Sequence, residues 1–123
     1  MSAWVAVTNL TRGRAVAQRV QLADRWLSRL RGLLGRRPLR DGEGLLLVPC
    51  RGVHMFGMRY AVDVVFVDRR GVVVATYPGL APGRRSKWHG RAVAALEVPA
   101  GTLETSGTQT GDALEWRPCL EAA

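Results

Sequence analysis

The stretch that decides the fold is residues 58–77, which read MRYAVDVVFVDRRGVVVATY. Two runs rich in β-branched and aromatic residues, 58–68 and 72–77, flank a short polar segment that ends at Gly71. Such runs are typical of strands, and a Gly after polar residues is typical of a tight turn. The sequence therefore predicts a hairpin of two strands at this point.

The same period-two alternation recurs on both sides of this hairpin. The segments that join the runs contain Gly, and the one at 9–13 predicts a second hairpin. The predicted strands do not alternate with helices, so the sequence does not favour a parallel sheet. The additional predicted strands are residues 4–8, 15–22, 45–48, 92–98 and 113–116.

One helical pattern lies at residues 24–34, where Asp24 is a suitable N-cap and apolar residues recur at helical spacing. Strands therefore dominate, and the fold class is mainly β, a small jelly-roll-like sandwich or barrel with one short α-helix. The predicted core draws on the helix and on the inward strand faces: Trp26, Leu30, Leu33, Leu46, Val48, Val62, Val64, Phe66, Leu96 and Val98.

A chain of 123 residues suits a single domain, which we expect to have its core at about residues 3–117 and a loose tail at 118–123. Its composition, 47% hydrophobic and 23% charged, is that of a globular protein. No apolar run approaches the roughly 18 residues that span a membrane, and the first residues lack a signal-peptide pattern. We expect a cytoplasmic monomer without membrane contact.

The net charge of +8 is concentrated in the first third of the chain. Residues 1–40 hold nine Arg and one acidic residue, whereas residues 41–123 hold nine basic and nine acidic residues. Basic blocks attract nucleic acid and other anionic polymers, although a solvated basic face is the simpler interpretation. The candidate anion-binding residues are Arg25, Arg29, Arg36, Arg84, Arg85 and Lys87.

The last three of these cations belong to a loop rich in Pro and Gly at residues 78–91, which also carries Trp88. An aromatic ring among cations suits binding of a single strand, because the ring stacks on a base and the cations hold phosphate. The loop is equally consistent with a lid over a pocket or with a solvated connector.

Two cysteines, Cys50 and Cys119, lie far apart in sequence, and we expect them to be reduced. Cys50 precedes His54 by four residues, a spacing that allows a nucleophile and base of the kind hydrolases use. Together with His89 these residues are of the types that bind zinc, but their spacing is not that of a zinc site. We predict no metal and no cofactor.

Two carboxylates stand inside predicted strands, Asp63 and Glu97. Charged groups are almost never buried unless they are paired, so each needs a partner. With His54 and Arg59 they are candidates to line one polar pocket, and the alternative is an internal ion pair. For Asp63 the expected partner is a charged residue on a neighbouring strand or loop, with His54 and Arg91 as candidates.

Several motifs follow one another along the chain, at residues 29–36, 43–46, 54–59, 63–68, 96–101 and 111–112, the last being Gly111 with Asp112. In this order they resemble the prokaryotic family called domain of unknown function 192. Where that family has a polar Lys-Asn-Thr stretch after its Met, this chain is shorter and has Ala61 near the position of a Pro, so no role of that stretch carries over. The resemblance implies a compact jelly-roll-like β fold without an established activity.

The sequence favours a binding or accessory domain whose polar pocket for an unknown small ligand contains His54, Arg59, Asp63 and Glu97. One alternative is weak, non-specific binding of nucleic acid or another anionic polymer through the Arg-rich first third. A second is a hydrolase-like enzyme that uses Cys50 with His54, or the two carboxylates. Trp88 and Asp112 are further candidate site residues.

Overall fold

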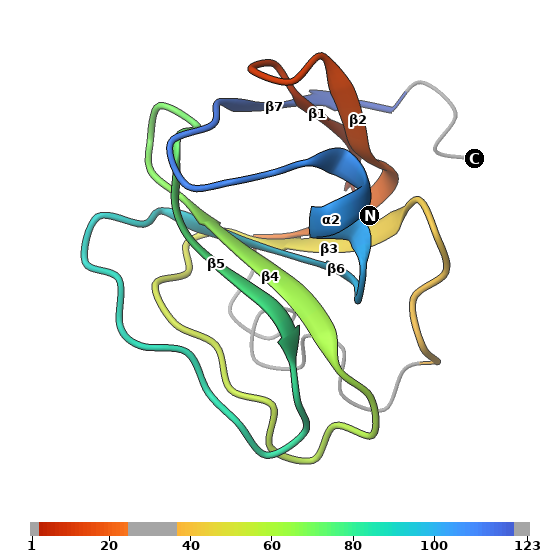
Figure 1. Cartoon of the computed structure of the whole chain (residues 1–123), viewed down its shortest axis with the longest axis vertical. Coiled ribbons are helices and arrows are strands. Elements are labelled where there is room, and N and C mark those ends of the chain that lie inside the picture. Colours follow the sequence, from red (N-terminus) through yellow and green to blue (C-terminus); the bar gives the residue numbers. More distant parts are fainter. Residues whose placement is uncertain (1–2, 25–36, 120–123) are drawn as a thin grey trace.

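The computed structural model describes residues 3–24 and 37–119. The fold is mainly β, as predicted, and the described part holds seven strands and one short helix (Figure 1). The predicted helix at 24–34 lies outside the described residues, apart from Asp24. The elements are β1 (Ala3–Asn9), β2 (Arg14–Ala23), β3 (Glu43–Leu47), β4 (Val62–Val67), β5 (Val73–Leu80), β6 (Ala94–Pro99), α2 (Thr102–Ser106) and β7 (Leu114–Pro118).

The strands form one sheet in the order β5-β4-β6-β3-β2-β1-β7, which curls into a half-barrel around α2 (Figure 1). Each neighbouring pair is antiparallel except β2 and β3, which run parallel. This pair departs from the pattern that the sequence favours. Parallel neighbours need a long connection, and residues 24–42 supply it between these two strands.

Both predicted hairpins are present. β1 pairs with β2 around the turn that follows Asn9, and β4 pairs with β5 around the turn that ends at Gly71. In the second turn Asp68 Oδ1 accepts the amide hydrogens of Arg70 at 2.8 Å and Val72 at 3.0 Å. Gly71 has φ +81°, a conformation that side chains rarely adopt, so the Gly in this turn is required by the backbone.

The sheet is buried on both faces near its centre. On β4, Val65 and Val67 belong to an inner core inside the curl, whereas Val62, Val64 and Phe66 belong to an outer core on the other face. The inner face packs against Leu103 of α2, and the outer face packs against loop residues such as Met55 and Ala92, so β4 is apolar on both sides. Of the predicted core, Leu46, Val62, Val64, Phe66, Leu96 and Val98 are buried, Val48 is half-buried, and Trp26, Leu30 and Leu33 lie outside the described residues.

Two long loops cover the outer core and run side by side (Figure 1). We call residues 48–61 and 81–93 the paired loops. The amide of Met55 donates to Arg84 O at 2.7 Å, and the amide of Ser86 donates to Val53 O at 2.9 Å. The predicted strand start at residue 58 is wrong, because 58–61 belong to the first of these loops and β4 begins at Val62.

The short helix α2 was not predicted, because five residues are too few to show a helical period. Gly101 before it and Gly107 after it both have positive φ, 98° and 70°. Between them Leu103 is buried in the inner core. The helix therefore fills the interior of the curled sheet.

Candidate functional site

Asp63 lies on the inner face of β4, where it is 1% exposed and surrounded by backbone amides. Its Oδ1 accepts from Gly79 at 2.7 Å, and its Oδ2 accepts from Gly101 at 3.1 Å and from Leu103 at 2.9 Å. The carboxylate thus ties the end of β5 and the start of α2 to β4. The prediction of a charged partner for Asp63, such as His54 or Arg91, is wrong, because backbone amides satisfy the carboxylate.

Glu97 lies on the outer face of β6, opposite Leu45 on β3 and Val64 on β4. It is 5% exposed, and no described residue donates a hydrogen bond to its Oε1. Burial without compensation disfavours the ionised form and raises the pKa of Glu97 to about 7.

The four residues of the predicted pocket do not come together. Asp63 and Glu97 face opposite sides of the sheet, so no single cavity contains both. Arg59 is exposed in the first paired loop. His54 is exposed as well, and its backbone forms an isolated bridge with Arg85 in the second loop.

The proposed nucleophile pair is likewise not assembled. Cys50 Sγ donates to Gly52 O at 3.2 Å, and the ring of His54 contacts the ring of Phe56, with centroids 5.0 Å apart. Cys119 Sγ donates to Gln18 O at 3.3 Å on β2. Within residues 3–24 and 37–119, no three His, Cys, Asp or Glu side chains gather in a way that suits a metal ion.

Asp112 links the turn between β1 and β2 to the turn that precedes β7. Its carboxylate accepts from Arg12 Nε at 2.9 Å, from Asn9 Nδ2 at 3.0 Å and from the amide of Gln109 at 3.0 Å. The hydrogen bond from Arg12 is the main cause that lowers the pKa of Asp112 to about 2. This arrangement is that of a structural clasp between the β1–β2 turn and the turn before β7.

The paired loops carry the candidate anion-binding residues that the structure describes. Arg84, Arg85 and Lys87 are all exposed, and Trp88 is 73% exposed. Across from them, Phe56 is 56% exposed. The other three candidates, Arg25, Arg29 and Arg36, lie outside the described residues.

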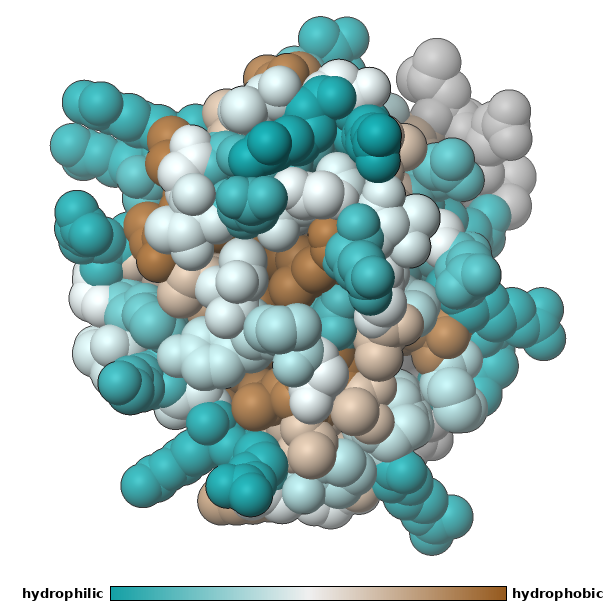
Figure 2. Space-filling model, in the orientation of Figure 1, coloured by the Kyte–Doolittle hydropathy of each residue, from teal (hydrophilic) through white to brown (hydrophobic). Residues whose placement is uncertain are grey.

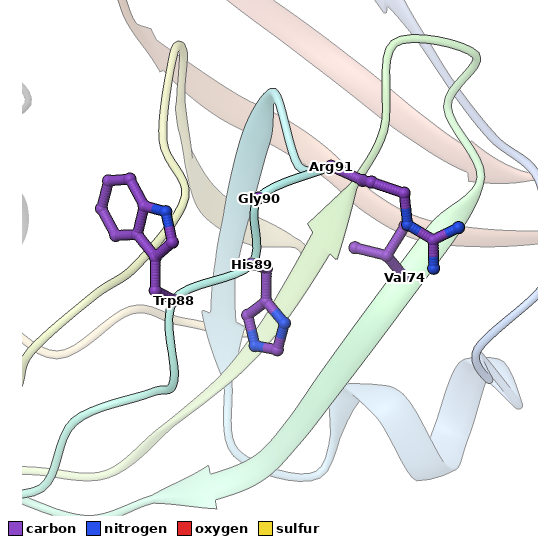
Figure 3. A pocket seen from close by; sticks show the side chains of 5 residues that line it. All are labelled: Val74, Trp88, His89, Gly90 and Arg91. Atoms are coloured by element: carbon purple, nitrogen blue, oxygen red, sulfur yellow. The ribbon is translucent and has the colours of Figure 1, made fainter.

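A pocket of about 250 Å³ opens beside the second paired loop (Figure 3). In Figure 3, His89 lies between Trp88 on one side and Val74 and Arg91 on the other. The Nε2 atom of His89 is 2.6 Å from the hydroxyl of Tyr77. The sequence indicates His89 only as a zinc-type residue and gives no sign of this pocket, because Tyr77 on β5 and His89 in the second paired loop meet only when that loop folds over the outer core.

Elsewhere on the surface, apolar residues show through in several small areas separated by hydrophilic side chains (Figure 2). Figure 2 shows one face of the molecule, with many polar side chains projecting from its rim. Among the described helices, none has the length and apolar character needed to cross a bilayer.

Known proteins and solved structures match this chain over nearly its whole length. A UPF0127 protein of Pyrococcus furiosus is 32% identical over 116 residues, which cover 88% of this chain and 95% of that protein. A solved structure of a protein of unknown function from Novosphingobium aromaticivorans superposes with a TM-score of 0.79 at 27% identity, covering 94% of this chain and 85% of that one. Another, described as a putative transcription regulator from Sinorhizobium meliloti, has a TM-score of 0.77 at 25% identity and covers 94% of both chains.

A family model confirms the family that the motifs predict. The model of DUF192, described as an uncharacterized ACR, matches residues 7–116. This match spans the sheet from β1 to β7, including Asp63 and Asp112. The chain is a member of the DUF192 family.

Proposed function

We propose that this domain is a binding module that holds single-stranded nucleic acid on its paired loops. The observation that carries the proposal is that two exposed rings, Phe56 and Trp88, stand in loops that hold several cations and no acidic residue. Neither loop contains Asp or Glu. The six cations of the two loops are Arg51, Arg59, Arg84, Arg85, Lys87 and Arg91.

The surface is held in place by the backbone before any ligand arrives. Gly83 donates to Met55 O at 2.9 Å, and His89 donates to Arg51 O at 2.8 Å, in addition to the two bonds that define the paired loops. A fixed surface loses less conformational entropy on binding than a mobile one. The loops therefore present their rings and cations as one platform.

Gly52 places the indole of Trp88 on this platform. A Cβ atom at Gly52 would lie 3.4 Å from Trp88 Cε3, so the ring rests against this glycine. An exposed indole with one edge supported is suited to stack on a base, and the cations around it are suited to hold phosphates. Such binding is tolerant of sequence and weakens with salt.

The sequence offers two basic segments to an anionic polymer, the Arg-rich first third and the loop at residues 78–91. The binding proposed here uses that loop together with the loop that pairs with it. The related protein from Sinorhizobium meliloti is described as a putative transcription regulator, and this description supports a nucleic-acid partner. A small-ligand role keeps one observation in its favour, the pocket beside His89.

The test is fluorescence anisotropy of a labelled 15-nucleotide oligo(dT) strand with the full chain, titrated at several salt concentrations. We expect Arg84→Gln with Arg85→Gln to weaken binding and to reduce the salt slope by roughly 1.4, because about 0.7 is lost per phosphate contact on a single strand. The matched control is Arg69→Gln with Arg70→Gln, two exposed adjacent arginines in the β4–β5 turn, which should leave the slope unchanged.

The contribution of the rings is tested separately. Trp88→Ala should weaken binding by about tenfold or more through lost stacking, whereas Leu10→Ala removes an exposed apolar side chain in another turn and should have no effect. Heparin that binds as tightly as the strand, or a Trp88→Ala protein that binds the strand normally, would contradict the proposal.

A further inference from the structure

The pocket beside His89 is built around a short hydrogen bond between two side chains. Tyr77 Oη lies 2.6 Å from His89 Nε2 and also accepts the amide hydrogen of Lys87 at 3.1 Å. The imidazole packs on Phe66 with ring centroids 4.8 Å apart, and Tyr77 packs edge-on against the same ring. The ring of His89 is thus held in one orientation by the outer core.

This network fixes the polarity of the pocket. Tyr77 Oη accepts from the amide of Lys87, and its own hydrogen can be donated to His89 Nε2. A neutral imidazole that accepts at Nε2 carries its hydrogen on Nδ1, and a protonated imidazole also carries one there. In these two states the Nδ1–H of His89 is a donor for a ligand such as a phosphate.

The wall of the pocket beyond His89 is cationic. Arg91 lines it and is exposed, and none of the ion pairs among the described residues involves its guanidinium. Guanidinium groups bind phosphate through parallel hydrogen bonds. Trp88 lies on the opposite side of the imidazole and offers a ring face (Figure 3).

We infer that this pocket is a nucleotide subsite, in which Arg91 and His89 hold a phosphate group and Trp88 stacks on the base attached to it. The inference rests on the proposed function, because Trp88 belongs to both the pocket and the paired-loop platform. It adds a defined position for one nucleotide of the strand. It also predicts that a single nucleotide binds without the rest of the strand.

The test follows the two histidine ring signals by NMR while uridine monophosphate is added to the full chain. The chain has two histidines, so His54→Ala assigns both signals. We expect the His89 signal to shift and the His54 signal to stay unchanged. Uridine and ribose 5-phosphate should each bind at least about tenfold more weakly than uridine monophosphate, because each lacks one of the two contacts.

Variants separate this subsite from the platform. Arg91→Gln should weaken uridine monophosphate binding about tenfold, while Arg84→Gln with Arg85→Gln should leave it unchanged, and Arg69→Gln serves as the control. A strand that binds while the mononucleotide leaves His89 unshifted would overturn the subsite and leave the platform standing. A mononucleotide that binds without any strand binding would overturn the platform. Inorganic phosphate that binds as well as uridine monophosphate would overturn the assignment to a nucleotide.

Discussion

Asp63 and Glu97 lie on adjacent strands of the sheet but project to opposite faces. Asp63 is paired in register with Val98, and Glu97 with Val64, so the two carboxylates alternate across the β4–β6 ladder. Three backbone amides satisfy the first, and among the described residues no donor reaches Oε1 of the second. The two acids therefore affect the protein in different ways.

Asp63→Ala should destabilise the fold by about 3 kcal/mol or more, because it leaves buried amides such as that of Leu103 without an acceptor. Asp63→Asn keeps one side-chain oxygen and should lie between the parent and the Ala variant. Denaturant unfolding of the three proteins measures the order. An Ala variant as stable as the parent would show that the amides find other acceptors.

Glu97→Gln should change how stability depends on pH. The folded pKa of about 7 exceeds the ordinary value of 4.5, so the parent's stability from this group is full below pH 4.5 and falls as the pH rises to about 7. At roughly 1.4 kcal/mol per pH unit the loss is about 3 kcal/mol. The Gln variant should lose this slope in unfolding curves between pH 5 and 8, and Glu104→Gln, an exposed change on α2, should keep it.

Asp112→Asn should act at the acid end of the pH range. The pKa of Asp112 is lowered to about 2, chiefly by the hydrogen bond from Arg12, so its contribution is present above pH 3.8 and is lost as the pH falls through about 2. The parent should therefore be more stable than the variant at pH 6, and the two should converge near pH 2. Thermal unfolding at both values checks this, and an equal difference at pH 2 would rule out the clasp as its source.

Gly71→Ala should be strongly destabilising for two reasons that a matched substitution separates. Gly71 and Gly79 both have positive φ, 81° and 59°, so an alanine at either position strains the backbone. Only at Gly71 would the added Cβ also collide with the carbonyl oxygen of Leu114. The melting temperature should fall further for Gly71→Ala than for Gly79→Ala, and equal losses would mean that β7 moves aside.

The strands and turns follow from local patterns, and for that reason the sequence predicts them well. Alternation at β4 and the Asp68 turn are set by neighbouring residues, and the resulting hairpin is confirmed. The site depends on register instead. Whether Glu97 shares a face with Asp63 is decided by which residues of β4 and β6 are paired, and a shift of one residue reverses the answer.

Contacts between loops that are far apart in sequence could not be predicted, for a related reason. Nothing in the order of residues shows that Met55 bonds Arg84, or that the amide of Leu103 reaches Asp63. Of the two exposed rings, the sequence indicates Trp88, which stands among cations in its own loop, and gives no signal for Phe56. The missing information was which loops pair with each other.

The pairing of β1 with β7 has a consequence for synthesis on the ribosome. Val5 lies opposite Pro118, so an outer edge of the first strand is covered by the last strand. During vectorial translation β1 emerges early, yet its amides and carbonyls on that side have no neighbour until β7 has left the exit tunnel. Such pairing between distant segments is slow and leaves an open edge exposed to other chains. The nascent protein thus keeps the edge of β1 unpaired, and open to pairing with other chains, until β7 is made.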